Sequence, residues 1–128
     1  MLRQVVLCLK QSSGIKLEKE GFKLDAQLKR GLIEACILKL LTKGDSYGYQ
    51  LVREAEEVLS ISESTLYPVL RRLETAGALT VYSMEHNGRL RKYYAVTDVG
   101  RKKINEFLTE WEDVMKVYDF IRRDQHDA

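Results

Sequence analysis

The spacing of hydrophobic residues predicts two amphipathic helices in the first half of the chain. Residues 24–41 repeat apolar side chains every three or four positions, which is typical of a helix with one buried face. That face is expected to comprise Leu24, Leu28, Leu32, Ala35, Cys36, Leu40 and Leu41. A second helix is predicted from Tyr47 to Val58, with a buried face of Leu51, Val52, Ala55 and Val58. Gly44 is expected to end the first helix, and Asp45 or Ser46 to cap the second.

A third helix has a clear start and a clear end. Ser62 is a favourable N-cap, and Gly77 lies where a left-handed residue commonly follows a helix. Its inner face is expected to comprise Leu66, Val69, Leu70 and Leu73. Pro68 falls inside the helix and removes one backbone hydrogen bond. Such a departure from local preference often marks a functional surface.

After the third helix the period of the pattern changes to two. Residues 79–84 alternate, and residues 90–96 are rich in aromatic and β-branched side chains, both of which are typical of strands. Between them, Asn87 and Gly88 form the strongest short signal for a two-residue hairpin turn. The sequence therefore predicts a β-hairpin over residues 79–96.

Thr97 and Asp98 are expected to cap a last helix, along which apolar residues repeat as heptads. The heptad seam comprises Ile104, Phe107, Trp111, Val114, Tyr118 and Ile121, with Leu108 and Met115 widening it. A repeat of this length favours pairing with the same helix of a second copy. The alternative is that the stripe packs back on its own domain.

Composition and charge narrow the class of protein. The 128 residues fit one domain, and contents of 45% hydrophobic and 31% charged residues exclude wholesale disorder. The net charge of +2 is too small to argue for nucleic acid, so only local clusters of cations can carry that case. No apolar run of the sequence reaches the ~18 residues that span a bilayer, and residues 5–9 are too short for a secretory signal. A cytoplasmic protein without a membrane partner is therefore expected.

The cysteines and histidines predict no catalytic or metal site. Cys8 and Cys36 lack a C-x-x-C spacing and partner histidines, which favours two buried or unreactive thiols, with a bridge between them as the alternative. His86 lies in the predicted turn and His126 in the tail, and neither has a nucleophile or carboxylate at a recognisable spacing. The chain is therefore expected not to be an enzyme and to need no cofactor.

Three helices followed by a two-stranded hairpin are the layout of a winged helix-turn-helix. The fold is therefore expected to be mainly α with a small β-hairpin. Residues 24–97 form the predicted DNA-binding domain, residues 98–128 a C-terminal dimerisation helix, and residues 1–23 an N-terminal extension of unassigned role. In this layout the third helix enters the major groove of DNA, and the hairpin, or wing, lies against the backbone or the minor groove.

A helical wheel places three candidate DNA contacts on the outer side of the third helix. Ser64 and Tyr67 offer hydroxyls, and Arg71 offers a fork of donors that suits guanine or phosphate. Arg72 lies at the flank of this face, where a phosphate is the expected partner. The alternative for both arginines is a solvated helix face.

Candidate contacts to the DNA backbone lie outside the third helix. The wing carries Arg89, Arg91 and Lys92 around its turn, and such cations bind phosphates with release of counterions. At the start of the second helix, Ser46 and the backbone amides around Tyr47 are expected to hold a phosphate. Charged wing residues alone can simply prevent aggregation, but together with this layout they favour double-stranded DNA as the partner.

Four segments of the chain, in this order and spacing, resemble the PadR family of bacterial transcriptional regulators. They are QLKRG at 27–31, GDSYGY at 44–49, TLYPVLRRLE at 65–74 and RKYYAVT at 91–97. The resemblance implies a homodimeric winged-helix repressor of a palindromic operator, with the C-terminal helix mediating dimerisation. The single helix after the wing is similar to that of the short-tailed subfamily.

The resemblance also implies roles for individual residues. Tyr67 of the TLYP motif is expected on the DNA face, with Arg71 four positions later. Of Tyr93 and Tyr94, one is expected to pack inside the wing and the other on its opposite face.

Trp111 matches a position where multidrug-sensing members of that family place a tryptophan between the two subunits. This implies a planar aromatic or cationic effector held by Trp111 and Phe107. The alternative is a tryptophan that only fills the interface. For the protein as a whole, the alternative function is a winged-helix module that binds a protein partner and no DNA.

Overall fold

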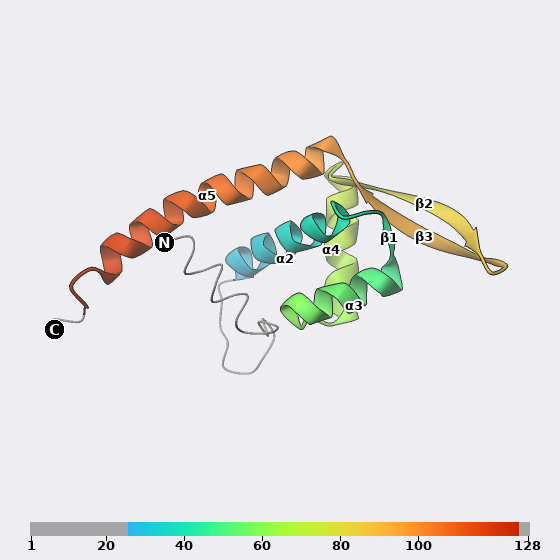
Figure 1. Ribbon diagram of the computed structural model, residues 1–128, viewed down its shortest axis with the longest axis horizontal. Helices are drawn as coiled ribbons and strands as arrows, with labels where there is room; N and C mark the ends of the chain where they lie inside the picture. Colours follow the sequence, from blue (N-terminus) through green and yellow to red (C-terminus); the bar gives the residue numbers. More distant parts are fainter. Residues whose placement is uncertain (1–25, 126–128) are drawn as a thin grey trace.

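The computed structural model describes residues 26–125, whose helices flank a small sheet with a projecting hairpin (Figure 1). The helices are α2 (Ala26–Leu41), α3 (Gly48–Leu59), α4 (Glu63–Thr75) and α5 (Asp98–Arg122). The strands β1 (Ser46–Tyr47), β2 (Leu79–His86) and β3 (Arg89–Val96) form an antiparallel sheet in the order β1-β3-β2. The prediction of a mainly α fold with a winged helix-turn-helix layout is confirmed. No helix in the described part of the chain is long and apolar enough to cross a membrane.

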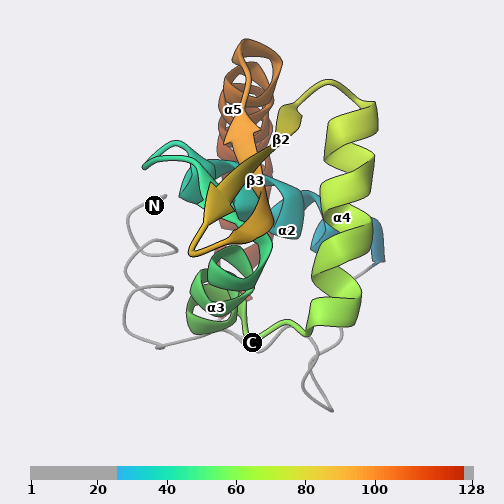
Figure 2. The ribbon, with the colours of Figure 1, turned by 90° about the vertical axis from the view of Figure 1, so that its right-hand side faces the viewer.

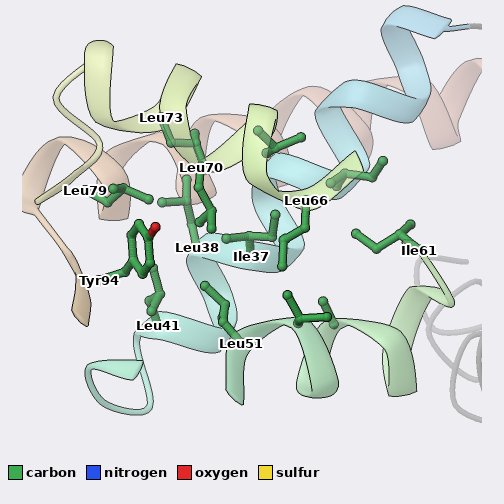
Figure 3. Packing of buried hydrophobic residues seen from close by; sticks show 14 of the residues in the cluster. Ile37, Leu38, Leu41, Leu51, Ile61, Leu66, Leu70, Leu73, Leu79 and Tyr94 are labelled. Atoms are coloured by element: carbon green, nitrogen blue, oxygen red, sulfur yellow. The ribbon is translucent and has the colours of Figure 1, made fainter. Parts of the chain in front are cut away.

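One hydrophobic core joins the helices to the sheet (Figure 3). Leu38 of α2, Leu51 of α3 and Leu70 of α4 are almost completely buried, and the sheet contributes Leu79 and Tyr94. The predicted inner face of α4 is buried as expected, at Leu66, Val69, Leu70 and Leu73. Because α4 meets the core along this face, its opposite side is free to meet another molecule.

The buried face of α2 differs from the prediction. The buried residues are Ile33, Ile37, Leu38 and Leu41. Five residues of the predicted face are only partly buried, namely Leu28, Leu32, Ala35, Cys36 and Leu40. Helix α2 contacts α3, α4, α5 and β3, so apolar residues surround most of it and their spacing does not single out one face. Leu24 lies outside the described residues.

Helix α3 begins and ends one residue later than predicted. Tyr47 occupies its N-cap position without a side-chain capping hydrogen bond. Ser46 lies one residue earlier in β1, where it pairs with Tyr94 of β3. At the other end the helix extends to Leu59, which is buried, whereas Val58 is 44% exposed. The predictions of a cap at Asp45 or Ser46 and of a buried Val58 are therefore wrong.

The hairpin turn has the predicted backbone. Asn87 and Gly88 have φ angles of 52° and 77°, and two successive positive φ angles are those of a type I′ turn. The two strands pair without interruption, with Leu79 opposite Val96 and His86 opposite Arg89. The wing is therefore a regular two-stranded ribbon.

Thr97 caps α5 and also joins it to the end of α4. Its Oγ1 accepts a hydrogen bond from the amide of Gly100 at 3.1 Å and donates one to the carbonyl of Gly77 at 2.6 Å. The predicted cap is confirmed, and it ties the start of α5 to the residues that leave α4.

The apolar stripe of α5 divides into two parts. The residues of the first part are buried or half-buried within the chain; they are Ile104, Phe107, Trp111 and Met115. The residues of the second part are exposed; they are Leu108, Val114, Tyr118 and Ile121. The first part follows the alternative interpretation, in which the stripe packs on its own domain, and the second part has no cover within the described residues.

Candidate nucleic-acid interface

The outer side of α4 carries the predicted polar side chains. Figure 2 shows α4 standing to one side of the projecting hairpin. On the side of α4 away from the core, Ser64 and Arg71 are exposed, whereas Tyr67 is half-buried and packs partly against the core. This face thus offers hydroxyls and a guanidinium group to an approaching partner.

Tyr67 has a second role that its position on the helical wheel did not reveal. Its ring packs against the core, and its hydroxyl reaches the first turn of α3. A Cβ atom added to Gly48 would lie only 2.9 Å from the Tyr67 hydroxyl, so glycine allows this close approach. Tyr67 therefore joins α4 to the start of α3, with part of its surface left for a partner.

A cleft of about 430 Å³ opens where α3, α4 and β3 meet. Its lining comprises Tyr47, Gly48, Tyr49, Tyr67, Arg91, Lys92 and Tyr94. The N-terminus of α3 contributes the positive end of a helix dipole, and the two wing cations add full charges. An anion such as a backbone phosphate suits this combination of charges and amides.

The wing cations lie on different faces of β3. Arg91 is half-buried, and its guanidinium carbon lies 4.5 Å from the centre of the Tyr47 ring. Lys92 and Arg89 are exposed. Because side chains alternate along a strand, Arg91 and Arg89 share the outer face of the sheet, whereas Lys92 shares the face of buried Tyr94.

The structure separates the two adjacent arginines of α4. Arg72 directs its Nε towards Glu34 of α2, with Nε and Oε1 3.6 Å apart, whereas Arg71 is exposed on the outer face. A partly exposed pair of this kind contributes only about 0–1 kcal/mol. Arg72 therefore lies at the flank of α4, as expected. The carboxylate of Glu34 would compete with a DNA phosphate for its guanidinium group.

Ser46 does not reach the surface where it was expected. The residue is 8% exposed, it pairs with Tyr94 in β1, and its hydroxyl lies 3.4 Å from the carbonyl of Tyr47. Gly48 and Tyr49 line the cleft, so the start of α3 presents these residues, with Tyr47, to a partner.

Sequence reasoning missed Tyr49 and Arg53 on the exposed face of α3. Tyr49 is 59% exposed, and the guanidinium carbon of Arg53 lies 5.9 Å from the centre of its ring. Both residues line a shallow groove with Ser62, Glu63 and Ser64 at the start of α4. Their four-residue spacing, with Tyr and Arg on one helix face, is the signal that identifies them.

The described residues contain one cysteine and no cluster of metal-ligating side chains. Cys36 is a free cysteine, and burial raises the pKa of its thiol to about 11, so the thiol stays protonated at neutral pH. Cys8 and the proposed alternative bridge lie outside the described residues. Within residues 26–125 no group of His, Cys, Asp or Glu side chains is arranged to hold a metal ion.

Residues 37–106 match the transcriptional regulator PadR-like family. A protein from Lysinibacillus sphaericus without a described function is 34% identical over 97 residues, which cover 72% of this chain and 89% of the relative.

Solved structures share both sequence and fold with the chain. The protein smu.1704 from Streptococcus mutans is 43% identical, with a TM-score of 0.64 over 73% of this chain and 90% of that protein. A transcriptional regulator from Clostridium thermocellum is 35% identical, with a TM-score of 0.64 over 76% of this chain and 96% of that regulator.

Proposed function

The chain belongs to the PadR-like family of transcriptional regulators, and on this premise we propose that it is a cytoplasmic repressor that binds a palindromic operator as a homodimer. Members of this family regulate transcription and are not enzymes. The observation that carries the proposal is the cleft in which the start of α3, Tyr67 of α4 and two wing cations meet. It continues the exposed face of α4, so one surface offers both base-reading and phosphate-binding groups.

In this proposal α4 lies in the major groove. Arg71 is the guanidinium group on its exposed face that suits the O6 and N7 atoms of guanine, and Ser64 offers a hydroxyl nearer the helix start. Arg89, Arg91 and Lys92 of the wing bind phosphates, which supplies affinity without sequence preference. Arg72 serves the backbone at the flank of the helix.

Replacing Arg71 and Arg91 separately by alanine distinguishes these two roles. We expect Arg71→Ala to weaken binding to the operator by about 1–3 kcal/mol and to change binding to mixed-sequence DNA much less. Arg91→Ala is expected to weaken both and to lower the salt slope by about one unit for each protomer bound, because each protomer loses one phosphate contact. The operator is first found by genome-wide mapping of bound DNA. Equal losses on both DNAs for Arg71→Ala would assign Arg71 to the backbone.

The homodimer is supported by the exposed part of the heptad seam. Val114, Tyr118 and Ile121 are each between 46% and 61% exposed, and Phe120 nearby is 71% exposed. An apolar surface of this kind on a regular helix is typical of an interface. A second copy of α5 has the matching heptads, so a symmetric pair covers both surfaces.

An effector site at Trp111 is the remaining element of the proposal. The rings of Phe107 and Trp111 lie 5.8 Å apart, and Trp111 is half-buried. Beside Phe107, a groove of about 180 Å³ between α2 and α5 is lined by Glu34, Glu106 and Glu110 and also by Lys103, whereas Trp111 lies outside its lining. Aromatic rings beside carboxylates suit planar or cationic compounds.

Fluorescence of Trp111, the single tryptophan of the sequence, tests this effector site. We expect flat cationic dyes to quench it with saturation at micromolar concentration and to weaken operator binding about tenfold, which requires ~1.4 kcal/mol of differential affinity. The Phe107→Leu dimer, which keeps the fluorophore but lacks the neighbouring ring, is the control and should bind the dye more weakly. If no compound quenches the tryptophan, or quenching leaves DNA affinity unchanged, Trp111 serves packing alone.

A further inference from the structure

Three tyrosines form a row across the outer face of the sheet, one on each strand. Tyr93 of β3 lies opposite Tyr47 of β1 and opposite Tyr82 of β2, so the three residues share one level of the sheet. The rings of Tyr82 and Tyr93 are stacked at 5.6 Å, and those of Tyr47 and Tyr93 meet edge to face at 5.7 Å. We call these residues the tyrosine row. Ser46 and Tyr94 are both buried, so the row occupies the opposite face, away from the core.

One end of the row is fixed by a hydrogen bond across the sheet. The Tyr82 hydroxyl donates to Oδ2 of Asp45 at 2.6 Å. Asp45 comes directly before β1, whereas Tyr82 lies on β2 at the other edge of the sheet. This bond, which raises the pKa of Tyr82, therefore spans the central strand and ties the wing to the turn that follows α2.

The other end of the row contacts a cation of the proposed DNA interface. Arg91 precedes Tyr93 by two residues, so its side chain shares the outer face and leans diagonally towards the neighbouring strand. There the guanidinium carbon lies 4.5 Å from the centre of the Tyr47 ring, a cation–π distance. Arg91 and Tyr47 both line the cleft at the start of α3.

We propose that Tyr47 is a positioning residue for Arg91, and that Tyr93, Tyr82 and Asp45 hold Tyr47 in place. A long arginine side chain on a projecting ribbon loses rotational freedom when it binds a phosphate. Stacking on a fixed ring restricts that freedom before DNA arrives, so less is lost on binding. This inference rests on the proposed function, in which Arg91 contacts the DNA backbone.

A double-mutant cycle on a mixed-sequence DNA duplex at low salt tests the inference. We expect Arg91→Ala to weaken binding about tenfold, the loss of one charge-assisted contact, and Tyr47→Leu to weaken it about fivefold. The double variant is expected to bind no more weakly than Arg91→Ala alone, because Tyr47 acts through Arg91. Tyr47→Phe keeps the ring and is expected to bind within about twofold of the wild type.

Arg89 provides the matched control for the cycle. It lies on the same face of β3 as Arg91 but two residues nearer the turn, opposite His86. Effects of Tyr47→Leu and Arg89→Ala should therefore add. Tyr82→Phe removes only the hydroxyl that donates a hydrogen bond to Asp45, so it provides a second variant if Tyr47→Leu fails to fold. We expect it to weaken binding about twofold, and only while Arg91 is present.

Two outcomes overturn the positioning role while leaving DNA binding intact. In the first, Tyr47→Leu lowers DNA affinity as much in the Arg91→Ala background as in the wild type. The same holds for Tyr82→Phe if that variant is used. In the second, Tyr47→Phe binds as weakly as Tyr47→Leu, which would make the hydroxyl itself the contact. If the wild type does not bind the duplex at all, the proposed function fails first, and the positioning role falls with it.

Discussion

Replacing Val114 by glutamate is expected to convert the protein to monomers and to abolish operator binding. Val114 is 46% exposed on the uncovered part of α5, between Trp111 and Tyr118 along the heptad seam. Burying one large apolar side chain stabilises an interface by about 1.5–3 kcal/mol, and several residues of each chain are available. In a symmetric pair the substitution introduces two carboxylates into this apolar interface, which are costly to bury unpaired. In the proposed palindromic operator two half-sites are read together, so monomers are expected to lose the operator.

Sedimentation at micromolar concentration measures this effect. Thr109→Glu is the matched control, because it adds the same charge at an exposed position on another side of α5 and should leave the dimer intact. A wild-type monomer, or a Val114→Glu variant that remains dimeric, would contradict the role proposed for the seam.

Gly100→Ala is expected to lower the free energy of unfolding by about 3 kcal/mol. Gly100 is buried in the first turn of α5, and a Cβ atom there would lie 2.2 Å from the carbonyl oxygen of Ala78 and 2.8 Å from Cγ2 of Val96. The Ala78 oxygen belongs to the backbone and accepts a hydrogen bond from the amide of Thr97. This oxygen cannot move aside without breaking that hydrogen bond, so the methyl group of alanine must push α5 away from the sheet.

Thermal unfolding followed by circular dichroism checks the expected loss, which corresponds to a melting temperature lower by about 10–20 °C. Gly31→Ala is the matched control, because its Cβ atom would lie 3.9 Å from Phe107, an ordinary contact. In a helix that substitution should leave stability unchanged or raise it by up to about 1 kcal/mol. A Gly100→Ala protein that melts within a few degrees of the wild type would show that α5 can yield there.

The sequence predicted elements whose signals are local. The inner face of α4 followed from its spacing because that helix meets the core on one side only, and the hairpin followed from Asn87 and Gly88. The buried face of α2 could not be predicted from its spacing, because neighbours surround that helix and its apolar residues point in several directions. Strand β1 has only two residues, too few for any period to appear, so the sequence predicts a helix cap at Ser46 where the structure has a strand.

The candidate site was predictable in its charges but not in its contacts. Arg71 lies on the exposed face of α4, as the helical wheel indicated. The contact of Asp45 with Tyr82 joins residues 37 positions apart, and the approach of Gly100 to Ala78 depends on how α5 leaves the sheet. Such pairs depend on tertiary packing, which leaves no repeating pattern in the sequence.

The affinity of the wild-type protein for a mixed-sequence DNA duplex, measured over a range of salt concentrations, tests the central claim most directly. Each phosphate that a cation neutralises contributes about −0.9 to the slope of log affinity against log salt concentration. With the wing cations Arg89, Arg91 and Lys92 on the backbone, the slope is expected to be about −3 or steeper. If the protein does not bind the duplex, or if its affinity does not change with salt concentration, DNA recognition is contradicted. Either result would favour a winged-helix module that binds a protein partner.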